Sequence, residues 1–154
     1  MSHQIPDLIS QLMLIINNVS DDTHEKEEWS SLLSESELAL VENVTLTECH
    51  VIDYIGNHRL TNAVSIAAAL GITKGGISKI TARLLAKKLI ETHRMEGNRK
   101  EIFLTLTPVG KEVFELHAGL HARMYERLTN MFSDYSREEL DVVGRFLNDL
   151  QKLV

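Results

Sequence analysis

The spacing of apolar residues predicts an amphipathic helix at each end of the chain. Near the N-terminus, helical spacing starts around Pro6, a residue favoured in the first turn of a helix, and we expect this helix to continue to about Leu33. An acidic loop then reaches residue 44. Near the C-terminus, Ser136 and Glu139 form a capping box ahead of the last helix. The apolar positions are Ile5, Leu8, Ile9, Leu12, Ile15, Ile16 and Val19 in the first helix, and Leu140, Val143, Phe146, Leu147 and Leu150 in the last.

Three shorter helices are predicted in the middle of the chain. A capping box at Thr45 begins one that ends near Asn57, a second spans residues 62–70, and a third spans residues 73–88. Gly71 separates the last two helices. A glycine there allows the sharp corner of a helix-turn-helix.

Two short strands and a long helix follow. Residues 90–92 and 101–105 alternate as strands on either side of residues 96–98, whose Glu-Gly-Asn sequence suits a hairpin turn. The Thr-Pro pair at 107–108 supplies a cap and a first-turn proline for a helix that reaches about Phe132. The expected fold is therefore mainly α with a small β-hairpin (α+β).

Length and composition exclude several classes of protein. At 154 residues the chain is one domain, or one domain with a helical appendage, and its 44% apolar content is ordinary for a globular protein. No apolar run approaches the roughly 20 residues that cross a bilayer, and no basic segment precedes an apolar block as in a signal peptide. The single cysteine, Cys49, excludes an internal disulfide. We expect a cytoplasmic protein that does not associate with membranes.

Positive charge is concentrated between residues 74 and 100. This window holds eight cations and two anions, a net charge of +6, whereas the whole chain carries −6, so the remainder sums to −12. An acidic protein that gathers half of its cations in one helix and one hairpin has a surface suited to a polyanion such as DNA. The cations are Lys74, Lys79, Arg83, Lys87, Lys88, Arg94, Arg99 and Lys100.

The helix over residues 73–88 is expected to have one apolar and one basic face. By spacing, the inward residues are Ile77, Ile80, Leu84 and Leu85. Small residues on the outer face allow close approach to a phosphate backbone, and its cations reach phosphates or guanine edges. The hairpin would act as a wing on an adjacent minor groove or backbone. The predicted DNA contacts are Lys74, Gly75, Ser78, Lys79 and Arg83 in the helix, and Arg94, Arg99 and Lys100 in the hairpin.

Three strings in the chain carry a family resemblance. They are AAALGITKGGISKITARLL (residues 67–85), LIETHR (residues 89–94) and NRKEIFLTLTPVG (residues 98–110). The last string matches a wing and the start of the helix after it. With these strings the chain resembles the MarR family of bacterial winged-helix transcription regulators, and the resemblance covers essentially the whole chain.

The resemblance implies a homodimer that presents two winged helices to a pseudo-palindromic DNA operator, most simply as a repressor. It divides the chain into an N-terminal dimerisation helix and acidic loop (1–44), a winged helix-turn-helix DNA-binding domain (45–107) and C-terminal dimerisation helices (108–154). The broad apolar faces of the terminal helices support a dimer independently, because a single domain of this size would struggle to cover them.

The wing departs from the family pattern at one position. The family has Asp-x-Arg in the wing, whereas the aligned residues here are Asn98, Arg99 and Lys100. The change removes a carboxylate that helps to brace the wing, so that ion pair is not expected. The positive charge that would contact DNA is retained.

Three histidines are candidate metal ligands. His117 and His121 stand four residues apart on one helix face, a favoured arrangement for two zinc ligands. In zinc-responsive members of the family, a histidine of the second helix and two of the fifth join a glutamate of the first, and His50, His117 and His121 fall at the matching positions. The candidates for the fourth ligand are Glu25, which we choose, and Glu27, Glu28 and His24.

The same histidines would also fit a cleft that binds no metal. The strings at residues 48–56 (ECHVIDYIG) and 116–121 (LHxxxH) also resemble family members that regulate fatty-acid synthesis, which are not known as metal sensors. Zinc and a small organic or lipid ligand therefore both remain open as the effector. Cys49, with apolar neighbours in a helix, fits a core position better than a redox sensor.

Two other function classes compete with a DNA-binding regulator. A small zinc-dependent enzyme would carry a catalytic motif, yet the sequence has no HExxH, no Gly-x-Ser-x-Gly and no phosphate-cradling glycine loop. A helical interaction module would not need its cations gathered between residues 74 and 100. We therefore expect a DNA-binding transcriptional regulator that is not an enzyme and requires no cofactor.

Overall fold

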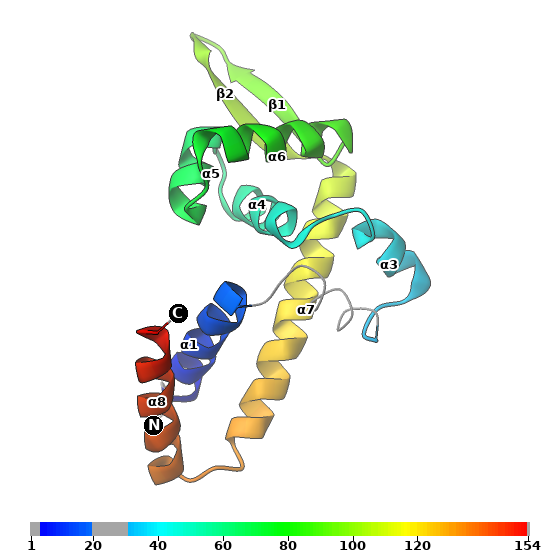
Figure 1. Ribbon diagram of the computed structural model, residues 1–154. Coiled ribbons are helices and arrows are strands. Elements are labelled where there is room, and N and C mark those ends of the chain that lie inside the picture. The colour runs from blue at the N-terminus through cyan, green and yellow to red at the C-terminus, as the bar shows by residue number, and fades with distance from the viewer. Residues whose placement is uncertain (1–3, 20–30, 154) are drawn as a thin grey trace. The chain divides into compact units, whose positions relative to one another are not determined.

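The computed structural model describes residues 4–19 and 31–153, without the side chains of residues 17–19 and 99. These residues form two compact units (Figure 1). The first unit contains α1 (Gln4–Val19), the part of α7 (Pro108–Phe132) that starts at Leu120, and α8 (Arg137–Gln151). The described part of the second unit runs from residue 31 to Gly119.

The core of the first unit is formed by apolar side chains from its three helices. α1 packs against α8, and Gln4 Nε2 donates a hydrogen bond to Asp141 Oδ1 at 2.7 Å. The predicted capping box of Ser136 and Glu139 begins α8. The buried residues of this core are Leu8, Ile9, Ile15, Phe132, Leu140 and Leu147.

A helix-turn-helix is the centre of the second unit. The second unit contains α3 (Glu35–Val41), α4 (Leu46–Asn57), α5 (Ala63–Leu70) and α6 (Lys74–Ala86), and α5 and α6 form the helix-turn-helix. Thr45, Asn62 and Thr73 begin the last three, each with a side chain that accepts a backbone N–H. Gly71 ends α5 at φ 66°, a conformation that glycine adopts without strain, and a bend of 118° separates α5 from α6.

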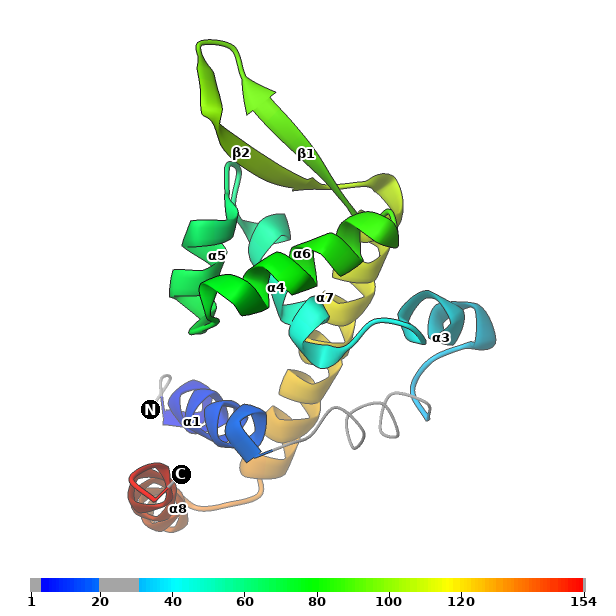
Figure 2. The same cartoon turned by 45° about the horizontal axis from the view of Figure 1, so that its top comes forward.

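The hairpin consists of β1 (Ile90–Met95) and β2 (Asn98–Leu106). The strands pair in antiparallel fashion from Ile90 opposite Leu106 up to a turn at Gly97, whose φ is 85°. Figure 2 shows the hairpin projecting from the helices of the second unit. A hairpin beside a helix-turn-helix is the arrangement of a winged helix.

The motif Thr-Pro-Val-Gly at residues 107–110 joins the hairpin to α7. Thr107 Oγ1 accepts a hydrogen bond from Gly110 N at 3.0 Å and donates one to Lys88 O at 2.7 Å. A Cβ at Gly110 would come within 1.9 Å of the Leu89 carbonyl oxygen. Only glycine therefore lets the start of α7 lie this close to the chain between α6 and β1.

The predicted fold class is confirmed, and the structure corrects four details. Residues 31–33, expected to end the first helix, form a turn instead. Residues 34–42, expected to be loop, contain α3, whose seven residues are too few for the apolar spacing to show a helical period. The strands reach closer to the turn than expected. Leu85, expected to face inward, is 38% exposed, because the buried stripe of α6 is narrower than the spacing suggested.

Two predictions have no structural outcome. The continuation of the first helix over residues 20–30 lies outside the described residues. The domain boundaries at residues 44 and 107 remain a prediction.

Among the described helices, none is long and apolar enough by itself to span a membrane. Only α5 and α6 taken together reach the required length and composition, and they are strongly bent relative to each other.

Candidate nucleic-acid interface

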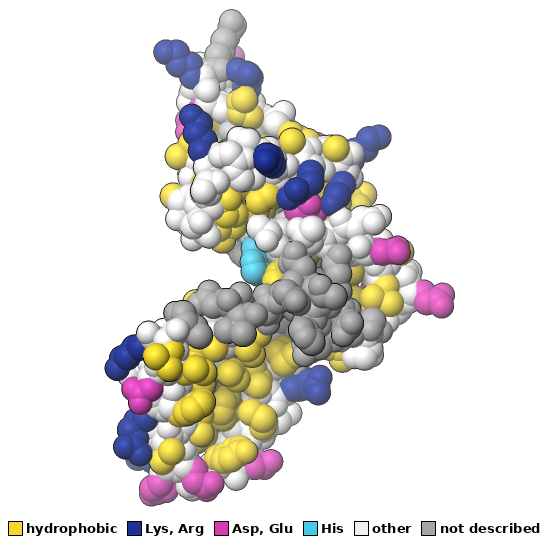
Figure 3. All heavy atoms as spheres, in the orientation of Figure 1, with side chains coloured by type: hydrophobic (Ala, Val, Ile, Leu, Met, Phe, Trp, Pro, Cys, Tyr) yellow, Lys and Arg dark blue, Asp and Glu magenta, His cyan; other side chains and the backbone are white. Residues whose placement is uncertain are grey.

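α6 presents a small and basic face on its exposed side. Ile77, Ile80 and Leu84 are buried against the second unit, as their spacing predicted. The helix residues predicted to contact DNA are all exposed, namely Lys74, Gly75, Ser78, Lys79 and Arg83. Figure 3 shows lysine and arginine side chains gathered over α6 and the hairpin.

The small residues on this face are not required by packing within the chain. A Cβ at Gly75 would meet no atom within 4 Å, although glycine costs a helix about 1 kcal/mol relative to alanine. Ser78 Oγ donates to Lys74 O at 3.0 Å, which leaves its oxygen lone pairs available to accept hydrogen bonds from outside. Because both residues have small side chains, a phosphate backbone can approach the helix closely at these positions.

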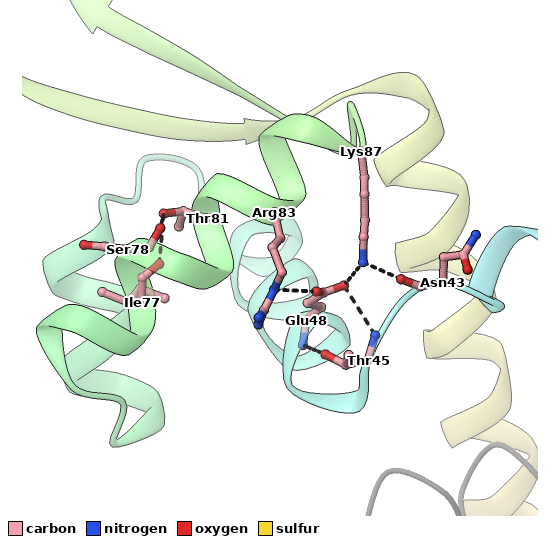
Figure 4. Close-up of polar contacts among 8 residues, drawn as sticks. All are labelled: Asn43, Thr45, Glu48, Ile77, Ser78, Thr81, Arg83 and Lys87. Atoms are coloured by element: carbon pink, nitrogen blue, oxygen red, sulfur yellow. Dashed lines mark hydrogen bonds and ion pairs between the residues drawn. The ribbon is translucent and has the colours of Figure 1, made fainter.

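A buried carboxylate, Glu48, ties α4 to α6 (Figure 4). Its Oε1 accepts a hydrogen bond from Arg83 Nε at 3.1 Å, and its Oε2 accepts one from Lys87 Nζ at 2.7 Å. The same side chain completes the α4 capping box through Thr45 N at 3.3 Å. Lys87 also donates to Asn43 O. Glu48 thus meets the requirement that a buried charge be both paired and hydrogen-bonded.

This contact gives Arg83 a role that the sequence did not suggest. Its Nε is occupied by Glu48, yet its side chain remains 54% exposed. Arg83 therefore fixes α6 against α4 while it still adds positive charge to the exposed face. Its direct contact with DNA remains a prediction, as do the contacts of the other residues on this face.

The hairpin carries the second group of cations. Arg94 on β1 and Lys100 on β2 are exposed. The side chain of Arg99, the third predicted contact in the wing, lies outside the described residues. The wing contacts with DNA also remain a prediction.

The histidines predicted as metal ligands lie on α4 and α7. His117 Nδ1 lies 2.6 Å from Asp53 Oδ2. His121 follows one turn later on α7, and one ligand atom each from Asp53, His117 and His121 lies within 4.8 Å of the others. His50 stands edge-on to His117, with ring centroids 6.3 Å apart, and is not part of this group. Glu25, the predicted fourth ligand, lies outside the described residues.

Sequence reasoning missed Asp53. Its carboxyl oxygen Oδ1 is buried and has no hydrogen-bond partner among the residues that the structure describes. A signal was present, because Asp53 follows His50 by three residues and so lies one turn along the same helix. Glu48 was recognised as a helix cap, but its pairing with α6 joins residues 35 and 39 positions apart and left no local signal.

A cavity of about 460 Å³ lies within the second unit at the C-terminal end of α4. Its apolar walls and the charged or titratable side chains beside them would suit a small amphipathic molecule. The lining residues are Ile55, Gly56, His58, Thr105, Leu106, Lys111, Phe114 and Glu115.

The sequence is similar to those of known transcriptional regulators. The sequence profile of the MarR family matches residues 42–101. The HTH-type transcriptional regulator YhjH of Bacillus subtilis (strain 168) is 30% identical over 137 residues, which span 82% of this chain and 78% of that protein. The family and this relative are regulators and not enzymes, as the sequence predicted.

Solved structures share the fold. Streptococcus pneumoniae FabT in complex with DNA matches with a TM-score of 0.61 and 26% identity, covering 86% of this chain and 93% of that one. Lactococcus lactis ZitR, a zinc-responsive MarR family member, matches with a TM-score of 0.64 and 22% identity, covering 71% of this chain and 76% of that one.

Proposed function

Because the chain belongs to the MarR family of transcriptional regulators, we propose that it binds duplex DNA as a homodimer and represses transcription. The observation that carries the proposal is the exposed face of α6, where small residues alternate with Lys74, Lys79 and Arg83. In a symmetric dimer two such helices would enter successive major grooves about one turn apart, so the operator would be pseudo-palindromic. The DNA complex of FabT supports this use of the fold.

The dimer is supported by apolar side chains that stay exposed in the first unit. A monomer seldom exposes a large apolar patch to water. The resemblance to the MarR family implies that the terminal helices of one protomer pair with those of the other. Figure 3 shows hydrophobic side chains gathered on this unit. The exposed residues are Leu14, Ile16, Tyr125, Met131, Tyr135, Val142, Phe146 and Leu153.

The experiment for DNA binding is a titration of the full chain against genomic duplex fragments at several salt concentrations. We expect a subset of fragments to bind tightly at low salt and to release as salt rises, because phosphate contacts displace counterions. Absence of binding at low salt, with and without added zinc, would contradict the proposal.

We further propose that zinc is the effector and that Asp53, His117 and His121 hold it. One carboxylate and two imidazoles are ligands that zinc favours, and a buried carboxyl oxygen without a hydrogen-bond partner fits a site for a cation. Asp53 takes the ligand position that was predicted for His50. Bound zinc would restrain α4 through Asp53, and α4 also holds α6 through Glu48. That shared helix offers a route for coupling between metal and DNA.

Calorimetric titration with zinc tests this site. Removing a direct ligand is expected to weaken zinc binding by about 100-fold or more, since even outer partners of metal ligands are worth 10- to 100-fold. We expect this loss in His117→Ala and in Asp53→Asn, and no change in His93→Ala, a histidine exposed on the wing. Equal affinities in the wild type and in His117→Ala would exclude the site. The effector would then be sought as a small organic molecule in the 460 Å³ cavity.

A further inference from the structure

One carboxylate ties the tip of the wing to the start of α5. Glu101 on β2 is partly buried. Its Oε2 accepts a hydrogen bond from Asn98 Nδ2 at 2.9 Å, and its Oε1 accepts one from Asn62 Nδ2 at 2.8 Å. Asn62 in turn caps α5, because its Oδ1 accepts from Ser65 N at 2.8 Å. A single acidic side chain therefore links the turn of the hairpin to the first helix of the helix-turn-helix.

A backbone contact joins the same two segments further from the tip. Leu104 N donates to Thr61 O at 2.8 Å, and Figure 2 shows the chain before α5 beside β2. Closer to the tip, the register of the two strands shifts between His93 and Met95. A two-stranded hairpin is marginally stable on its own. Glu101 extends the anchorage of the wing past Leu104 toward this less regular end.

We infer that Glu101 is a positioning residue for DNA binding, which sets the angle of the wing through Asn98 and Asn62. The inference rests on the proposed DNA-binding function. A carboxylate beside a DNA backbone repels phosphates, so Glu101 contributes by orienting the cations Arg94 and Lys100 and not by contact.

The same network explains why Asn98 stands where the family pattern has aspartate. Asn98 Oδ1 accepts from Glu101 N at 3.3 Å, so its amide nitrogen is the atom that faces the Glu101 carboxylate. An aspartate at residue 98 would place a second carboxylate within 2.9 Å of the Glu101 carboxylate. In this chain the wing is instead held by a hydrogen bond between the Asn98 amide and the Glu101 carboxylate.

An exchange of the two side-chain types tests the inference. Asn98→Asp sets two carboxylates against each other, and Glu101→Gln sets two amide donors against each other. Each single variant is expected to bind operator DNA about tenfold more weakly, the effect of losing one charge-assisted hydrogen bond. In the double variant N98D/E101Q, the new amide donates to the new carboxylate and still accepts from Asn62. We expect its DNA affinity to return to within about twofold of the wild type, since the number of hydrogen bonds is restored.

The net charge of the variants distinguishes the positioning role of Glu101 from its electrostatic effect on DNA binding. By charge alone E101Q would tighten DNA binding because it removes an anion, whereas loss of the brace weakens it. Glu96→Gln at the exposed hairpin turn removes the same charge without touching the network, so it is expected to bind DNA at least as tightly as the wild type. The double variant carries the wild-type charge.

The measurement is fluorescence anisotropy of the full chain with a duplex selected from genomic fragments, together with hydrogen exchange at Leu104 N and a thermal melt. Recovery in the double variant, with faster wing exchange in the single variants only, supports the inference. Single variants that bind like the wild type, or a double variant as weak as the product of the single losses, overturn it. Failure of the wild type to bind any duplex would instead overturn the DNA-binding proposal itself.

Discussion

Replacing Val142 and Phe146 with glutamate is expected to dissociate the proposed dimer and to abolish operator binding. The two side chains are 54% and 64% exposed and lie one turn apart on α8, so they share one face. Neither belongs to the buried core of the first unit, so each protomer should still fold. The V142E/F146E variant would bury two unpaired carboxylates per protomer in the interface. Such burial costs several kcal/mol, and we expect the dimer dissociation constant to rise by about 1000-fold or more.

The oligomeric state is measured by light scattering at micromolar concentration, in parallel with DNA binding. Asn148→Glu, which also introduces a glutamate at an exposed position on α8 but adds only one negative charge, is the control and should remain dimeric. A V142E/F146E protein that stays dimeric would place the interface elsewhere. A monomer that still binds the operator with wild-type affinity would contradict the proposal that the protein binds DNA as a dimer.

Glu48→Ala is expected to lower both the stability of the second unit and its affinity for DNA. The change removes the half of the α4 capping box in which Glu48 Oε2 accepts from Thr45 N, and it removes the carboxylate that pairs with Arg83 and Lys87. Because both cations keep access to solvent, we discount the two ion pairs and expect a total loss of about 2–3 kcal/mol. This corresponds to a fall of roughly 5–10 °C in Tm for a chain of this size.

Thermal denaturation and DNA titration of the same preparations check this prediction. Glu48→Gln keeps an acceptor for the α4 cap but loses the charge, so its loss of stability should be about half as large. Glu112→Ala, an exposed acid on α7, controls for the change of net charge. An E48A protein with the Tm and the DNA affinity of the wild type would show that the buried carboxylate does not hold α6 in place.

The helices of the second unit were predictable because their signals are local. Caps at Thr45, Asn62 and Thr73, the corner at Gly71 and the apolar spacing within α6 all lie within a few residues of the structure that they determine. α3 was not predicted, because a seven-residue helix spans only two turns and shows no clear helical period. The outer face of α6 followed from the same periodicity, so the DNA-facing residues there could be chosen from the sequence.

The polar contacts that support this face could not be predicted. Glu48 meets Arg83 across 35 residues and Asn62 meets Glu101 across 39, and these distances in sequence carry no periodic signal. The departure at Asn98 was visible in the sequence, but it indicated only a missing ion pair. The hydrogen bond that takes its place depends on how the hairpin lies against α5.

The salt dependence of DNA binding by Lys79→Ala decides whether α6 carries the DNA contacts of the proposed dimer. For the wild type the logarithm of affinity should fall linearly with the logarithm of salt concentration, with a slope of about −0.9 for each phosphate contact. K79A removes one contact per protomer, so its slope should be shallower by about 2 for the dimer. Lys152→Ala, the same change of charge at the exposed end of α8, should keep the wild-type slope. A K79A slope equal to that of the wild type, with equal affinity, would show that α6 does not make the DNA contacts proposed for it.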